Sequence, residues 1–110
     1  MNFDTFSEKI GEWLEHIHDT LQCKGAEYAK DDDRLHNFHL AAAILRTTPE
    51  KALLGMLAKH LVSVIDEVLE PTRAWASAGW RDEKIGDCIC YLLLLACLWE
   101  EKAEKEKEGK

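Results

Sequence analysis

The residue with the clearest chemical potential is an aspartate in an otherwise apolar segment. Asp87 is the only charged residue between Ile85 and Trp99. A carboxylate in such surroundings costs free energy unless it is paired, hydrogen-bonded or bound to a metal. Glu83 precedes Asp87 by four residues and Tyr91 follows by four, so helical spacing places all three on one face. This polar line indicates either a metal site or a structural pair between Asp87 and a buried lysine or histidine.

A second polar group interrupts the apolar segment around residue 60. His60 and Ser63 lie among leucines and valines, flanked by Lys59 and Asp66. Since His60 and Ser63 are three residues apart, they share one face of a helix. We expect them to face other polar groups, with His60 either a hydrogen-bonded core histidine or a ligand-binding residue.

A third cluster combines carboxylates with cationic and amide side chains. It contains Lys24, Glu27, Asp33, Arg34, His36 and Asn37. Carboxylate oxygens suit Mg²⁺, and lysine and arginine suit phosphate oxygens. Carboxylates that converge from separate helices of a bundle are a known way to build such a metal site.

Helical signals dominate the first half of the chain. Thr5 and Glu8 have the spacing of a capping box at the start of a helix that should end near 24–25, at a glycine. Asp33 is a suitable N-cap for a second helix over 34–45.

Two further helices are predicted after these. Proline at a first helical position and a wide apolar face predict a third helix over 49–69. We expect a loop over 71–81, in which Trp75 and Trp80 either close one end of the core or line a ligand site. A fourth helix should begin at Asp82.

These elements predict one all-α domain over residues 1–110, built as a bundle of four main helices. Residues 99–110 are expected to form a charged, solvated helical tail that frays. The fourth helix is apolar nearly all round, so it must be covered on most sides. Because so short a chain supplies few neighbours, we expect a homodimer.

Charge and composition exclude several partners. Lysine and arginine total 14 and aspartate and glutamate total 21, a net charge of −7. This balance argues against electrostatic binding to nucleic acid or to an anionic membrane, but not against a nucleotide bound through a divalent cation. The longest apolar run, 88–99, is shorter than the ~20 residues that span a bilayer. With no signal peptide visible, a cytoplasmic location is expected.

The cysteines favour simple packing over a metal or disulfide framework. Cys23, Cys88, Cys90 and Cys97 form no C-x-x-C pair. We expect reduced, buried thiols that act as small apolar residues.

Two resemblances to known families follow from these motifs. Glu83-Lys84-x-x-Asp87-x-x-x-Tyr91-Leu92, at the start of a long apolar helix, resembles the last helix of MazG-like all-α nucleoside triphosphate pyrophosphohydrolases. Over residues 24–99 the chain also resembles small phage and bacterial nucleotide-modification-associated domain proteins, through three elements. These are Lys24-Gly25-x-Glu27-Tyr28, Asp33-Arg34-Leu35-x-Asn37-Phe38 and Lys59-His60-x-x-Ser63.

The resemblance implies a nucleotide-binding protein, and in its strongest form a Mg²⁺-dependent pyrophosphohydrolase. It would use Glu27 and Asp87 as catalytic residues, and Glu27, Asp66, Glu83 and Asp87 as metal ligands. Its phosphate- or nucleotide-binding residues would be Lys24, Asp33, Arg34, Asn37, Lys59, His60, Lys84 and Tyr91.

Two departures from the family pattern support a different reading. The helix before the last lacks the glutamate-x-x-glutamate pair of MazG-like enzymes, and Lys84 stands where an acidic residue should lie three before Asp87. The alternative is a non-catalytic helical binding or assembly module, whose buried polar network fixes the register of its helices.

Overall fold

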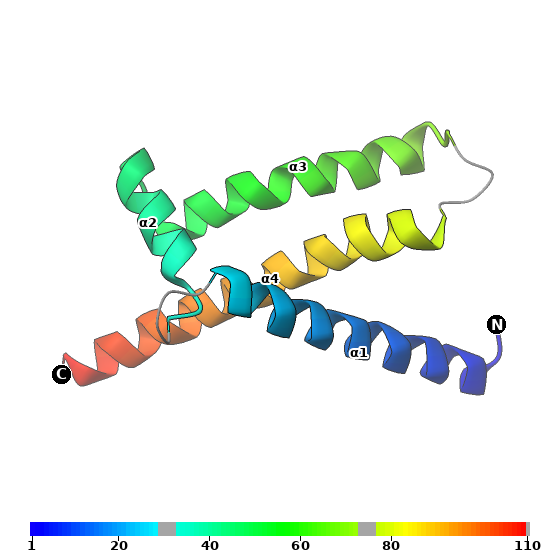
Figure 1. The fold of residues 1–110 in the computed structure, drawn as a ribbon, viewed down its shortest axis with the longest axis horizontal. Coiled ribbons are helices and arrows are strands. Elements are labelled where there is room, and N and C mark those ends of the chain that lie inside the picture. Colours follow the sequence, from blue (N-terminus) through cyan, green and yellow to red (C-terminus); the bar gives the residue numbers. More distant parts are fainter. Residues whose placement is uncertain (29–32, 73–76, 110) are drawn as a thin grey trace.

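A computed structural model of the chain contains four helices and no strand within its described residues (Figure 1). It describes the backbone of residues 1–28, 33–72 and 77–109, and the side chains of all of these except 24–28. The helices are α1 (Phe3–Tyr28), α2 (His36–Leu45), α3 (Pro49–Leu69) and α4 (Ala78–Glu108). The predicted all-α architecture is confirmed for this part of the chain.

Helix α3 has the predicted bounds because its start is specified locally. The Thr48 hydroxyl accepts a hydrogen bond from the Lys51 backbone N–H at 3.2 Å, and Pro49 occupies the first helical position. The first N–H groups of a helix have no partner within it. The Thr48 hydroxyl satisfies one of them, and Pro49 has no N–H to satisfy, so both residues favour a helix start here.

Helix α1 is longer at both ends than predicted. Asn2 caps it, since the Asn2 side-chain oxygen accepts a hydrogen bond from the Thr5 backbone N–H at 2.8 Å. The capping box at Thr5 and Glu8 was therefore the wrong starting point, because asparagine is an equally good N-cap three residues earlier. The helix also continues through Gly25 to Tyr28, since one glycine in a helix costs only ~1 kcal/mol.

The predicted start of α2 was also wrong. The Asp33 carboxylate accepts a hydrogen bond from the Leu35 backbone N–H at 3.0 Å, which makes a turn before the helix. The N-cap position falls instead on Leu35, whose side chain makes no capping hydrogen bond. Aspartate forms such local turns as readily as it caps helices, so its position alone did not fix the helix start.

Helix α4 begins earlier than predicted, within the segment expected to be a loop. The Ser77 hydroxyl accepts a hydrogen bond from the Trp80 backbone N–H at 3.3 Å, and the helix starts at Ala78. Trp80 is therefore a half-buried helical residue, whereas Trp75 lies outside the described residues.

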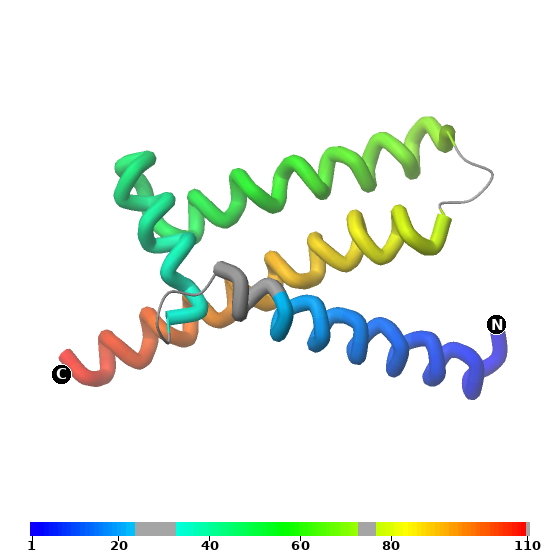
Figure 2. Tube along the Cα trace, viewed as in Figure 1, coloured from blue at the N-terminus to red at the C-terminus, as the bar shows by residue number. Residues whose placement is uncertain are grey.

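Helix α4 lies between α3 and α1, and α2 crosses the beginning of α3 (Figures 1 and 2). The buried core lies at the end where α2, α3 and α4 meet. Its members are Leu35, Phe38, Leu53 and Leu98, with Met56, Tyr91, Leu94 and Leu95 packed against them.

The arrangement is open for a chain of this length. Its radius of gyration is 16.5 Å, whereas a compact domain of this size has ~13 Å. Large apolar side chains remain exposed on every helix, and their exposed fractions reach 82% at Phe3 and 73% at Val68. The apolar faces of the long helices thus extend beyond the contacts that the described chain provides.

The crossing of α1 and α4 depends on a glycine. A Cβ atom added at Gly86 would lie 3.3 Å from His16 Nε2 and 3.8 Å from Ile17 Cδ1. His16 Nε2 also lies 3.3 Å from the Asp82 carbonyl oxygen, one turn earlier on α4. Gly86 therefore leaves room on α4 for the side chains of His16 and Ile17.

Replacing Gly86 by leucine should loosen α1. The larger side chain would occupy the space of His16 and Ile17, and overpacking of this kind typically costs about 1–3 kcal/mol. Urea unfolding followed by circular dichroism should show this loss, together with faster amide hydrogen exchange in α1. The control is Gly55→Leu, since nothing lies within 4 Å of a Cβ atom at Gly55. Equal effects of the two substitutions would contradict this view of the crossing.

Candidate functional site

The polar residues singled out by the sequence meet between α3 and α4. On α3 the side facing α4 carries a residue every three or four positions: Leu53, Leu57, His60 and Val64. On α4 the matching set is Asp87, Tyr91, Leu94 and Leu98. This is the spacing with which two helices pack side by side. His60, Asp87 and Tyr91 therefore form one polar layer in an otherwise apolar contact.

The polar layer is compact and largely shielded from water. His60 Nδ1 lies 3.6 Å from Asp87 Oδ2, and only 17% and 13% of the two side chains are exposed. The His60 ring also lies against Tyr91, with ring centroids 5.6 Å apart and planes tilted by 31°. His60 Nδ1 is buried and has no hydrogen-bond partner among the described residues.

A separation of 3.6 Å is an ion-pair distance, longer than a good hydrogen bond. The structure thus gives Asp87 a histidine neighbour that is shielded from solvent. Lys84, with 22% of its side chain exposed, lies one turn before Asp87 on α4 and 3.8 Å from the Glu83 carboxylate.

The predicted metal ligands that the structure describes differ in their exposure to solvent. Asp66 is exposed and 66% of the Glu83 side chain is accessible to solvent, whereas Asp87 is largely buried in the polar layer. The side chain of Glu27 lies outside the described residues. Among the side chains that are described, no three histidine, cysteine, aspartate or glutamate residues are grouped so that they could hold a metal ion.

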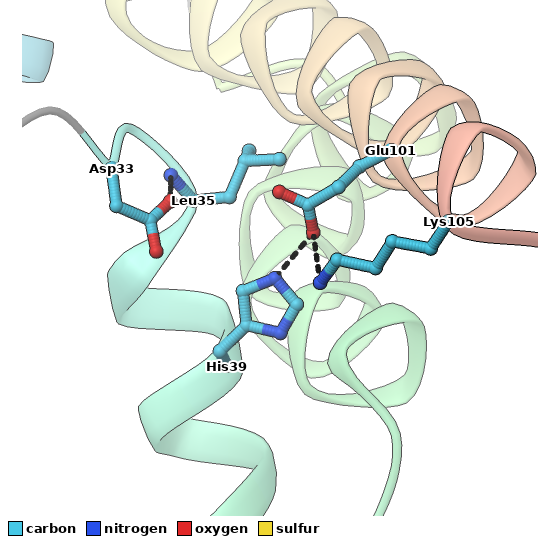
Figure 3. Close-up of polar contacts among 5 residues, drawn as sticks. All are labelled: Asp33, Leu35, His39, Glu101 and Lys105. Atoms are coloured by element: carbon cyan, nitrogen blue, oxygen red, sulfur yellow. Dashed lines mark hydrogen bonds and ion pairs between the residues drawn. The ribbon is translucent and has the colours of Figure 1, made fainter. Parts of the chain in front are cut away.

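The predicted phosphate-binding residues also divide into separate groups. Asp33, Arg34, Asn37 and Lys59 are exposed, whereas His60, Lys84 and Tyr91 are partly buried between α3 and α4. The side chain of Lys24 is outside the described residues. The Asp33 carboxylate is engaged by its own turn, as Figure 3 shows.

A second polar cluster, which the sequence analysis did not identify, ties α2 to the end of α4. His39 Nε2 lies 2.7 Å from Glu101 Oε1, and Lys105 Nζ lies 3.7 Å from the same oxygen (Figure 3). The Glu101–Lys105 spacing of four residues was visible in the sequence, but the partner on α2 is 62 residues away. At this position the tail predicted to be solvated and fraying is instead anchored.

The cluster borders an open cleft of about 420 Å³ between α2, α3 and α4. Leu98 contributes an apolar wall, and residues of both charges surround it, including Glu50, Lys102 and Glu106. Because acidic and basic groups alternate around the cleft, it presents no single charge to a ligand.

The four thiols differ in environment. All are free, but Cys23 and Cys97 are exposed, so the predicted burial holds fully only for Cys90. Burial raises the pKa of the Cys88 thiol, the neighbouring Asp87 carboxylate raises it further, and Lys84 lowers it to a lesser extent. Desolvation and a nearby negative charge both disfavour the thiolate.

Comparisons with protein families, with curated proteins and with solved structures find no match to this chain. The resemblance to MazG-like proteins therefore rests on the sequence motifs quoted above. Within the described residues, none of the helices has the length and apolar character needed to cross a membrane.

Removal of the Asp87 charge should test the role of the polar layer. If Asp87 pairs structurally with His60, Asp87→Ala should lower the free energy of unfolding by about 1–3 kcal/mol, because the buried His60 Nδ1 loses its polar neighbour on α4. Replacing both residues, as in His60→Leu with Asp87→Leu, should recover most of this loss, since an apolar pair needs no partner. The measurement is urea unfolding of both variants and of wild type. A double variant as unstable as Asp87→Ala would contradict a structural pair.

The thiol chemistry gives an independent prediction about Asp87. Asp87→Asn removes the negative charge that raises the pKa of Cys88, so the thiolate fraction of Cys88 at pH 8 should increase. Iodoacetamide labelling followed by peptide mass spectrometry should show faster modification of Cys88. Cys23 serves as the internal control because it lies in α1, and its rate should not change.

Proposed function

We propose that the chain is a non-catalytic helical assembly module that completes its hydrophobic core by pairing with a second copy. The observation that carries the proposal is the uncovered apolar surface of the long helices in an open arrangement. A monomeric protein rarely leaves large contiguous apolar patches exposed, and such patches mark interaction sites.

The polar layer is a second observation that supports this proposal. In paired helices, one polar layer in an apolar contact fixes the alignment of the helices at some cost in stability. His60 and Asp87 have the burial and spacing for that role between α3 and α4. Their side chains face each other across the helix contact, which leaves little of either accessible to an incoming ligand.

Nucleotide hydrolysis stays the competing proposal, because it follows from the motifs. It would require Asp87 to share a metal with further carboxylates. The described candidates, Asp66 and Glu83, are exposed and not grouped with Asp87 around a common point. The observed geometry therefore favours assembly over hydrolysis.

Two measurements on the wild-type protein separate these proposals. Light scattering coupled to gel filtration should give twice the chain mass, with a dimer that strengthens as salt is added. Added salt should stabilise the dimer because each copy carries a net charge of −7, and salt screens the repulsion between the two copies. Incubation with common and modified nucleoside triphosphates and Mg²⁺ or Mn²⁺ should release no pyrophosphate and should leave the melting temperature unchanged.

A monomer at all concentrations would overturn the assembly proposal. Release of pyrophosphate would establish the hydrolase proposal in its place, especially if Asp87→Asn abolished it without lowering the melting temperature. Asp19→Asn is the matched control, because the Asp19 side chain is 70% exposed on α1 and belongs to none of the predicted metal or nucleotide sites.

A further inference from the structure

Helix α1 carries an apolar stripe that has no cover over its first half. Phe3, Phe6, Ile10 and Leu14, here called the α1 stripe, have exposed fractions of 82%, 53%, 44% and 66%. Their spacing places them on one side of the helix. One turn further on, Ile17 continues this side but is 3% exposed, near the crossing with α4 at Gly86. The α1 stripe is therefore the extension of a packed surface beyond the point where α4 covers it.

Helix α3 carries a second uncovered stripe beside its contact with α4. Leu54, Leu61, Ile65 and Val68, here called the α3 outer stripe, have exposed fractions of 58%, 43%, 46% and 73%. With Ala58 they repeat at intervals of four and three residues, the repeat of helices that pack side by side. Positions 54, 58, 61 and 65 each lie one residue after a position of the 53–57–60–64 set that faces α4, so the stripe is turned by about 100° from it.

The two stripes cannot cover each other within one chain. Helix α4 lies between α1 and α3, and the first half of α1 lies at the same end of the molecule as the second half of α3 (Figure 1). A twofold axis at that end would bring the α1 of each copy against the α3 of the other. The same surface of each copy, made of the α1 stripe and the α3 outer stripe, would then contact the equivalent surface of the other copy, as in twofold dimers.

The exposed area is adequate for a stable contact. The α1 stripe with Leu61, Ile65 and Val68 exposes about 700 Å² per copy, if a large apolar residue exposes roughly 170 Å² when uncovered. A standard interface buries ~800 Å² on each partner. Polar rims and the neighbouring Val62 and Leu69, which are also exposed, would add to the contact.

We infer that the α1 stripe of one copy packs on the α3 outer stripe of a second copy, reciprocally, in a twofold dimer. This inference rests on the proposed assembly function and specifies its interface. The matched repeat, the adequate area and the shared end of the molecule together select a second copy as the occupant.

A charge-complementation experiment tests this pairing. Ile10→Lys and Leu61→Glu each place a charge in the contact, so each variant alone should raise the dimer dissociation constant by at least ~100-fold. An equimolar mixture should form a heterodimer within ~10-fold of wild-type affinity. In that heterodimer the lysine meets the glutamate at one of the two contacts, and the other contact is unchanged. Native mass spectrometry identifies the heterodimer, and circular dichroism checks that each variant keeps its helices.

The matched control is Ile44→Lys on α2. Ile44 is as exposed as the stripe residues, at 71%, but it lies on a helix that the inferred interface does not use. This variant should dimerise like wild type.

The possible failures are distinguishable. A monomeric wild type would overturn both the interface and the proposed function. Single variants that dimerise normally, or a dimer lost on Ile44→Lys, would overturn the interface and leave self-association standing. If the single variants are monomeric and mixing does not restore the dimer, the α1–α3 pairing is wrong. In that case α1 would pack against α1 and α3 against α3, or each stripe would pack against a different helix.

Discussion

Three long helices arranged side by side can bury only the faces that meet, and this constraint governs the whole structure. Helix α4 has neighbours on two sides, whereas α1 and α3 each pack along one side of α4. Yet the sequence of α3 is apolar over more than one side, since both Leu53 and Leu54 belong to apolar stripes and only Leu53 is buried. Burial of apolar area is the main favourable term in folding, at about 25 cal/mol per Å². The uncovered stripes therefore represent stability that the described chain does not gain by itself.

The same constraint explains why the polar residues do not form an open catalytic centre. The contact between α3 and α4 is the most extensive one in the fold, and it contains His60, Asp87 and Tyr91. Charges in such a place interact strongly because water screens them little. The facing helix places His60 Nδ1 3.6 Å from the Asp87 carboxylate, so each polar group has the other as a neighbour within the apolar contact. Carboxylates that remain in water, such as Glu83, have no comparable need for a partner.

The elements that were predicted correctly have signals within a few residues of one another. Thr48 and Pro49 together specify where α3 begins, and the prediction of 49–69 is confirmed. Where two capping residues compete, as Asn2 and Thr5 do, local sequence does not decide, and the helix starts at the earlier one. Spacing likewise placed Glu83, Asp87 and Tyr91 on one face of α4, but it gave no information about how much of that face α3 covers. Glu83 lies one turn closer to the start of the helix and is largely exposed, whereas Asp87 is covered.

The contacts between helices could not be predicted from the sequence. They depend on how the helices are aligned, and packing between residues far apart in the chain sets this alignment. The pairing of His60 with Asp87 follows from the alignment that Leu53 and Leu98 impose at the core end. The contact between His39 and Glu101 fastens the same end, since it joins α2 to the tail of α4. The end where α2, α3 and α4 meet thus has a packed core and a polar tie, whereas the beginning of α1 and the end of α3 lie beyond these contacts. Local stability should follow this gradient, because segments with few buried contacts open most easily.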